Sequence, residues 1–133
     1  MEQPINSTLL PNANTGTQLI HLTGAPVLIQ IGSKDDYDRT KNDQDNADGT
    51  VNCRKLVAYL NSVNSGHIVD LAAYEGAYHA WDRLMVPVTV ADPFGNEGSF
   101  FTTRVPPNVR LFPDVDQAFA SRQNVVRFFR RNL

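Results

Sequence analysis

Cysteine is almost missing from this 133-residue sequence, which contains only Cys53. One cysteine excludes an internal disulfide framework, and residues 1–24 lack the basic start and apolar core of a signal peptide. We therefore expect a cytoplasmic protein. Neither sign of charge is in large excess, because the net charge is only −2. The composition therefore gives no sign of a basic surface that would attract nucleic acid or an anionic membrane. The longest apolar run, residues 25–31, is far too short to span a bilayer.

The sequence also lacks the spacing of a metal site. The acidic run at residues 43–49 (Asp-x-Asp-x-x-Asp-Gly) departs from the calcium-loop template, because the third ligand and the glycine are displaced and the final glutamate is missing. We interpret this run as a solvated loop and expect no metal or other cofactor. The three histidines are far apart and show no ligand spacing: His21, His67 and His79.

Hydrophobic patterning predicts a strand, a helix and a second strand. Residues 25–31 are a continuous β-branched and leucine run closed by Gly32, which is typical of a strand buried on both faces of a parallel sheet. Residues 51–64 place apolar side chains on one helical stripe, and residues 68–74 return as a strand. This order predicts a βαβ unit, and a composition of 41% hydrophobic and 20% charged residues fits one globular domain.

The second half of the chain predicts a long excursion and a closing helix. Residues 83–112 are rich in proline and glycine, and within them residues 86–90 and 99–105 are candidate strands that could pair. Residues 114–131 form the clearest helix, with acids in the first turn and arginines in the last, as the helix macrodipole favours. Its expected buried stripe is Val115, Ala118, Phe119, Val126 and Phe129. The fold class is α/β, with a small, partly parallel sheet, a βαβ crossover and a C-terminal helix.

The two predicted parallel strands end in the most informative motifs. The first is followed by residues 32–37 (Gly-Ser-Lys-Asp-Asp-Tyr) and the second by residues 74–82 (Tyr-Glu-Gly-Ala-Tyr-His-Ala-Trp-Asp). Because such strands end at the same edge of a sheet, we expect Asp35 and His79 within direct or one-water hydrogen-bonding reach. A carboxylate bonded to imidazole Nδ1 fixes the tautomer and stabilises the imidazolium. The alternative is a polar pair that only fastens two loops.

These motifs, with the helix around residues 53–57 and the closing residues 121–133, resemble the C-terminal part of the dienelactone hydrolase family. They come in the family's order over roughly residues 25–133, and the tract at residues 74–82 is the most specific. The resemblance implies a truncated α/β-hydrolase-like domain, with Asp35 at the triad-acid position and His79 at the triad-histidine position. The family's early strands, its oxyanion-hole loop and its Gly-x-Ser/Cys-x-Gly nucleophile elbow are missing from the sequence. Residues 1–24 are expected to form an N-terminal arm or short strand.

Several neighbouring side chains have expected roles around this pair. Of the two candidate replacements for the nucleophile, Ser33 lies beside the acid, and Cys53 is expected to be a small buried hydrophobe on the helix. Asp36 is expected to make local turn bonds. Four further side chains are candidates to line a cleft beside the histidine, and for the aromatic ones the equal alternative is packing in a core: Tyr37, Tyr78, Trp81 and Asp82.

Two functions from different classes follow. The first is a non-catalytic binding or assembly module, most simply a homodimer, because the strand at residues 25–31 would leave an unpaired edge that a second copy, a partner chain or residues 1–24 must cover. The second is a hydrolase of small esters or lactones, whose nucleophile comes from a partner chain or is water activated by His79. A small-molecule ligand fits either function. We expect the isolated chain not to hydrolyse activated esters above a His79→Ala control.

Overall fold

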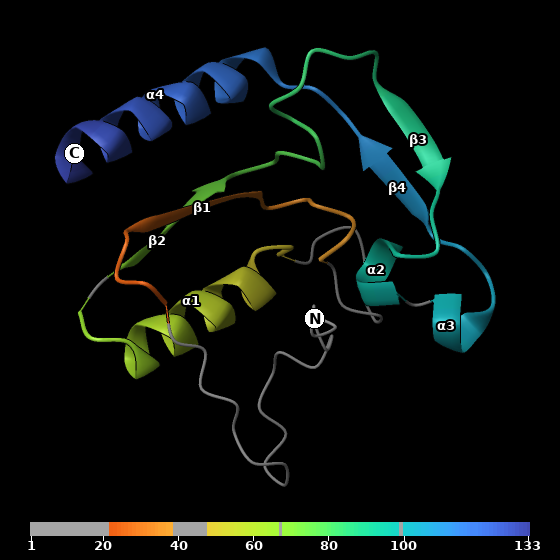
Figure 1. The fold of residues 1–133 in the computed structure, drawn as a ribbon. Helices are drawn as coiled ribbons and strands as arrows, with labels where there is room; N and C mark the ends of the chain where they lie inside the picture. Colours follow the sequence, from red (N-terminus) through yellow and green to blue (C-terminus); the bar gives the residue numbers. More distant parts are fainter. Residues whose placement is uncertain (1–21, 39–47, 67, 99) are drawn as a thin grey trace, which may run out of the picture.

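The computed structural model of the protein describes residues 22–38, 48–66, 68–98 and 100–133, and all structural statements below concern these residues. Along the chain the elements are β1 (Val27–Gly32), α1 (Val51–Val63), β2 (Val69–Tyr74), β3 (Val88–Ala91), α2 (Gly95–Gly98), α3 (Phe100–Thr103), β4 (Asn108–Leu111) and α4 (Val115–Asn132) (Figure 1).

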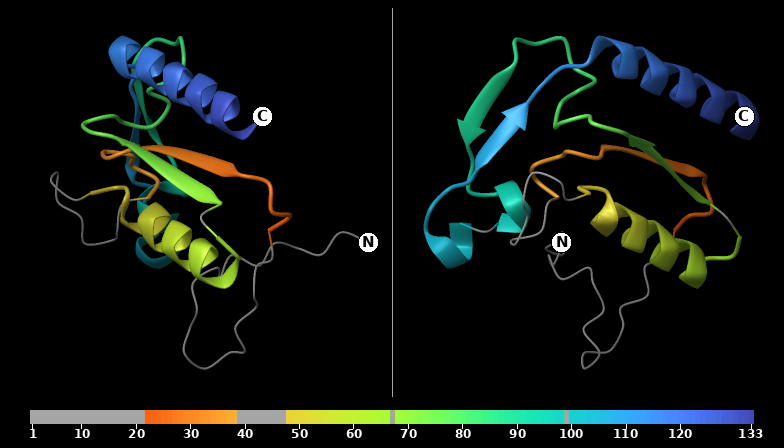
Figure 2. Two further views of the ribbon diagram at one scale, coloured as in Figure 1. Left: turned by 90° about the vertical axis from the view of Figure 1, so that its left-hand side faces the viewer. Right: turned by 180° about the vertical axis from the view of Figure 1, so that it is seen from behind.

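The predicted βαβ unit is confirmed. Strands β1 and β2 pair in parallel, with Val27 opposite Val69 and Gly32 opposite Tyr74, and α1 connects them. Helix α1 lies on one face of this pair and α4 on the other, so the elements form three layers (Figures 1 and 2). The two strands end at the same edge, and this places the loops that follow them next to each other.

The core is small and lies where β2 meets α4. Tyr74 and Trp81 stack with ring centroids 4.3 Å apart, and Ala77 completes their buried cluster. Helices lie on both faces of β1, but only Ile31 and Gly32 are fully buried and the other four residues of the strand are partly exposed. The described sheet has two strands, so each strand keeps one unpaired edge through which solvent reaches its residues.

The excursion forms an antiparallel pair, but one of its strands lies later than predicted. Strand β3 pairs with β4 from Val88 opposite Leu111 to Ala91 opposite Asn108, whereas residues 100–103, predicted as strand, form the short helix α3. Left-handed backbone at Gly98 (φ 72°) and Arg104 (φ 61°) brackets that helix and breaks the extended run. The two prolines at residues 106–107 donate no backbone hydrogen bond, so β4 begins only after them.

Helix α4 lies within one residue of its predicted bounds, and Asp114, predicted in the first turn, is instead the N-cap, whose side chain accepts a hydrogen bond from the Gln117 backbone N–H at 3.0 Å. The predicted buried stripe is wrong: of its five members only Ala118 is buried. The helix packs on the body through another face.

The predicted strand or arm before residue 22 lies outside the described residues. No described helix combines the length and apolar character needed to cross a membrane.

Candidate functional site

The two loops after β1 and β2 are fastened to each other by main-chain contacts. The backbone N–H of Ser33 donates to the Tyr74 carbonyl, and that of Lys34 donates to the Ala77 carbonyl, both at 2.9 Å. A Cβ atom on Gly32 would lie 2.3 Å from the Ala77 carbonyl oxygen, so only glycine allows the loops to approach this closely. The first loop carries Asp35, and the second continues to His79.

Asp35 and His79 form a direct pair, as the strand ends predict. The imidazole Nδ1 lies 2.8 Å from Asp35 Oδ2, and Asp35 Oδ1 accepts the backbone N–H of Tyr37 at 2.9 Å. Asp35 is buried, whereas 38% of the His79 side chain is exposed. With Nδ1–H donating to the carboxylate, Nε2 carries the lone pair, and no described residue bonds to it. The pair therefore presents a proton-accepting nitrogen at the edge of the sheet.

The neighbouring carboxylate favours the charged form of the imidazole. The hydrogen bond that His79 donates to Asp35 raises the pKa of His79 above its usual 6.5, and partial burial opposes this shift. A histidine with a raised pKa holds a proton more tightly once it has taken one. This is the electrostatic behaviour expected of a histidine that must carry positive charge during a reaction.

Tyr37 forms one wall beside the imidazole. Its ring meets the His79 ring edge-on, with centroids 4.5 Å apart, and its hydroxyl donates to Asp92 Oδ2 at 2.7 Å. Burial and the Asp92 carboxylate raise the pKa of Tyr37 to about 12. The Phe94 backbone N–H and the Tyr37 hydroxyl lower the pKa of Asp92. Tyr37 is thus neutral at neutral pH, and its hydroxyl proton is directed at Asp92.

A buried ion pair helps to position His79. The sequence did not predict this ion pair. Asp36 is fully buried, and Arg110 Nε and Nη2 donate to its two carboxylate oxygens at 2.8 and 2.7 Å. Asp36 was expected to make local turn bonds, and its pairing with a residue 74 positions later is a long-range contact that this expectation did not include. Arg110 lies in β4, and Phe112, the residue directly after that strand, donates its backbone N–H to the His79 carbonyl at 3.1 Å.

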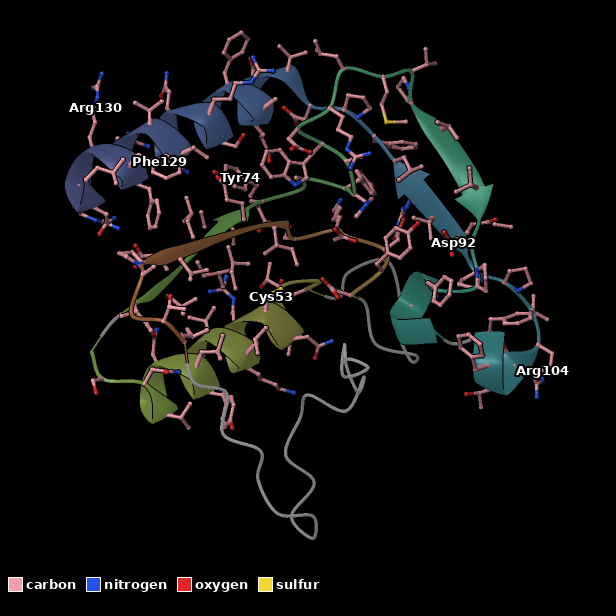
Figure 3. The ribbon with its side chains drawn as sticks, viewed as in Figure 1. Cys53, Tyr74, Asp92, Arg104, Phe129 and Arg130 are labelled. Atoms are coloured by element: carbon pink, nitrogen blue, oxygen red, sulfur yellow. The ribbon has the colours of Figure 1, made fainter. Side chains whose placement is uncertain are left out.

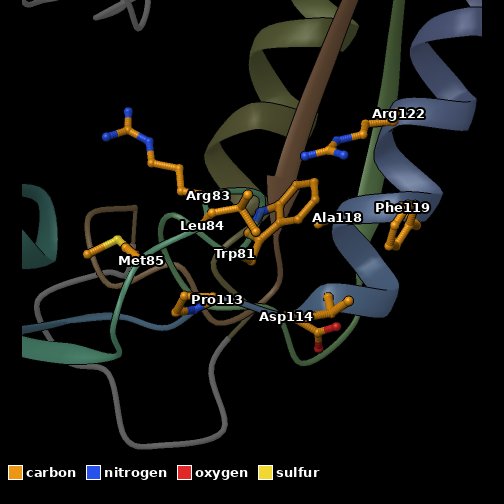
Figure 4. A pocket seen from close by; sticks show the side chains of 10 residues that line it. Trp81, Arg83, Leu84, Met85, Pro113, Asp114, Ala118, Phe119 and Arg122 are labelled. Carbon is orange, nitrogen blue, oxygen red and sulfur yellow. The ribbon is translucent and has the colours of Figure 1, made fainter.

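The four predicted cleft side chains separate into different surroundings. Tyr37 touches the histidine, while the Tyr78 ring lies under the Arg110 guanidinium at 4.5 Å and against Phe112 at 5.0 Å. Trp81 belongs to the core and lines a separate, mainly apolar cavity of about 460 Å³ between the loop at residues 83–85 and α4 (Figure 4). Asp82 is exposed and makes no hydrogen bond or ion pair with a described residue.

Neither candidate replacement for the nucleophile is available to the histidine. Ser33 is buried, and its hydroxyl oxygen accepts the Gly76 backbone N–H at 2.8 Å. Cys53 lies on α1, on the opposite side of the sheet from α4 (Figure 3), and its Sγ is 4.0 Å from an Asp38 carboxylate oxygen. Burial and nearby carboxylates raise the pKa of the Cys53 thiol to about 11, so at neutral pH it is a thiol rather than a reactive thiolate.

The structure describes only the last two residues, 48 and 49, of the acidic run at residues 43–49. Asp48 turns its carboxylate back to Thr50 at the start of α1, where the backbone N–H and the hydroxyl of Thr50 donate to it at 2.8 and 2.6 Å. The two earlier aspartates, at positions 43 and 45, lie outside the described residues. Within the described part of the chain, no three histidine, cysteine or acidic side chains gather as a metal site would require.

Comparison of the chain with models of protein families, with curated proteins and with solved structures finds no match.

Proposed function

We propose that this chain supplies the acid and histidine half of an α/β-hydrolase-type site for small esters or lactones. The nucleophile would come from a separate polypeptide segment. The observation that carries the proposal is the 2.8 Å contact between Asp35 and His79 at the carboxyl ends of two parallel strands, with 38% of the His79 side chain exposed. The resemblance to the dienelactone hydrolase family supports it, because the same two residues occupy the positions of that family's acid and histidine.

The proposed chemistry uses His79 as a base and then as an acid. As the oxygen or sulfur of the incoming nucleophile bonds to the ester carbonyl carbon, its proton passes to Nε2, and Asp35 stabilises the imidazolium. When the tetrahedral intermediate collapses, the bond to the leaving oxygen breaks and that oxygen takes the proton from Nε2. Water then repeats both steps on the acyl intermediate, which releases the acid and restores the nucleophile.

The isolated chain is not expected to turn over esters. Ser33 and Cys53 are held in other contacts, and donors that stabilise the developing oxyanion normally account for a large share of the rate. Those donors belong to the part of the family fold that the sequence does not contain. In the described sheet β1 pairs with β2 alone, and the other edge of β1 is the place where strands carrying the missing parts would pair.

A second candidate function is a binding or assembly module without catalysis. The observation that favours it is the apolar surface of α4, where four of the predicted core residues are exposed. In this second candidate the Asp35–His79 pair only fastens the two loops, and the cavity beside Trp81 is a site for a small molecule.

A fusion protein tests the first proposal. The nucleophile-bearing N-terminal half of a dienelactone hydrolase is joined ahead of residues 25–133, and ester and lactone hydrolysis is measured. We expect turnover that falls by about 10³–10⁴-fold in Asp35→Asn and to background in His79→Ala. The matched control is Asp82→Asn, which removes a nearby exposed carboxylate and should leave kcat/KM unchanged.

The isolated chain is assayed in parallel and should match its own His79→Ala variant. A soluble fusion with native-like circular dichroism but no hydrolysis dependent on His79 would contradict the hydrolase proposal and favour the module. Turnover by the isolated chain that is lost in His79→Ala would show instead that water or a residue of this chain serves as the nucleophile.

A further inference from the structure

Helix α4 attaches to its own domain through side chains seven residues apart. Gln117 donates to the Glu75 carbonyl at 2.7 Å, Asn124 donates to the Tyr74 hydroxyl at 2.6 Å, and Arg131 pairs with the Asp70 carboxylate. Residues at this spacing lie along one side of a helix. The side of α4 that faces the sheet is therefore fixed by three polar contacts, and the opposite side is turned to solvent.

The solvent side carries an apolar seam. Its six positions are separated by four, three, four, three and four residues, the alternation of a helix-pairing interface. Five are apolar side chains with 46–100% exposure, and the third position is the exposed Arg122. The apolar members are Val115, Phe119, Val126, Phe129 and Leu133. A surface helix normally turns such a stripe toward a core, and in the described part of the chain nothing covers it.

The seam is symmetric about its own centre. When a second copy of α4 is laid against it in the antiparallel direction, Val115 meets Leu133, Phe119 meets Phe129, and Arg122 meets Val126. Each pair occurs twice, as a two-fold axis requires. The two Arg122 side chains are each placed beside a valine rather than against one another, so the alignment avoids a clash of like charges at the centre.

The charges that flank the seam favour the same alignment. Asp116 and Arg130 occupy equivalent flanking positions at opposite ends, and neither bonds to a described residue. In an antiparallel pair, the Asp116 carboxylate of one copy faces the Arg130 guanidinium of the other, which gives two ion pairs for each dimer. Arg130 projects from α4 away from the sheet (Figure 3). Gln123, the flanking residue between them, meets its own copy at the two-fold axis.

The cavity of about 460 Å³ opens beside the first half of the seam. Its lining includes Val115, Phe119 and Arg122 of the seam together with Leu84, which is 89% exposed. In the antiparallel alignment, the side chains of Phe129 and Leu133 of the second copy reach this apolar cavity. An apolar hollow that receives large apolar side chains is typical of the core of a stable interface.

From these observations we propose that the protein forms a two-fold dimer in which the α4 helices of two copies pack antiparallel through this seam. The proposal is independent of the hydrolase half-site, because the seam lies on the side of α4 turned away from the sheet, whereas Asp35 and His79 lie on the loops that follow β1 and β2. It commits to a second copy as the occupant because both the apolar pairs and the charge pairs match under self-alignment.

Light scattering and sedimentation of charge variants test the dimer. The wild type should have twice the 14.8 kDa mass of the chain. Asp116→Arg and Arg130→Asp each convert both ion pairs to repulsions, and each should raise the dissociation constant roughly tenfold. The double variant Asp116→Arg/Arg130→Asp restores opposite charges across the interface and should return to near wild-type affinity.

The double variant separates an interface role from a role within the helix. Both substitutions place charges unfavourably for the helix macrodipole, so an effect on helix stability alone predicts that the double variant is worse than either single one. Lys55→Asp, an exposed substitution on α1 away from the seam, makes the same charge reversal as Arg130→Asp and should leave the mass unchanged. A wild-type mass near 14.8 kDa, or a double variant weaker than both single variants, would overturn the proposal.

Discussion

Removing the Arg110 guanidinium from the buried ion pair with Asp36 should strongly destabilise the domain. The Asp36 side chain has no exposed surface, while 25% of the Arg110 side chain is exposed. Two guanidinium N–H groups and the Arg110 backbone N–H donate to the carboxylate at 2.7–2.8 Å. Arg110→Met retains much of the side-chain volume but leaves a buried carboxylate without its guanidinium, which is the costly way to break such a pair.

The size of the effect follows from that burial. Removing one partner of a buried pair costs about 3–5 kcal/mol, a large fraction of the roughly 5–15 kcal/mol that stabilises a typical domain. For a chain of this length, that loss lowers Tm by roughly 10–20 °C. Asp36→Ala should lower the free energy of unfolding by less than Arg110→Met does, because the partly exposed Arg110 guanidinium can turn to water.

Thermal and urea unfolding, followed by circular dichroism, measure the difference. The matched control is Asp70→Ala, which removes the ion pair with Arg131. Both of those side chains are about half exposed, so the control should change stability by at most about 1 kcal/mol. If Arg110→Met were no more destabilising than Asp70→Ala, the argument from burial would be refuted.

Two further predictions concern titratable side chains. Because the pKa of Cys53 is raised to about 11, its thiolate fraction near pH 8 is roughly 200-fold smaller than that of a free cysteine with pKa about 8.5. A thiolate of higher pKa is more nucleophilic, so the reaction of Cys53 with a disulfide reagent should be slower by about tenfold or more, and labelling at the rate of free cysteine would contradict this. The pKa of His79 is raised on folding, so its contribution to stability is complete below the unfolded value of 6.5 and is lost as pH rises through the folded value. The stability gap between wild type and Asp35→Asn should therefore narrow as pH rises past 6.5, and a gap that widened would show that the sign is wrong.

Much of the fold is predictable because it rests on local patterns. The apolar run before Gly32, the stripe of α1 and the charged ends of α4 each lie within one segment. The Asp35–His79 contact is also predictable, since parallel strands joined by a helix must bring their carboxyl ends together. These features need no knowledge of distant residues.

The remaining features depend on contacts that no local pattern encodes. Nothing in the sequence near Asp36 points to Arg110, because the two residues approach only when β4 docks beside the first loop. Helix α4 has apolar side chains on both sides, with Val125 and Phe128 on one and Val126 and Phe129 on the other. Periodicity therefore could not decide which side faces the sheet. Polar contacts such as that of Asn124 with Tyr74 decide it.

The most direct test of the acid–histidine half-site is the titration of the His79 ring by ¹⁵N NMR, in wild type and in Asp35→Asn. We predict that in wild type the neutral ring carries its proton on Nδ1, that its pKa lies above 6.5, and that Asp35→Asn lowers this pKa. An unchanged pKa in Asp35→Asn, or a neutral ring protonated on Nε2 in wild type, would contradict the account.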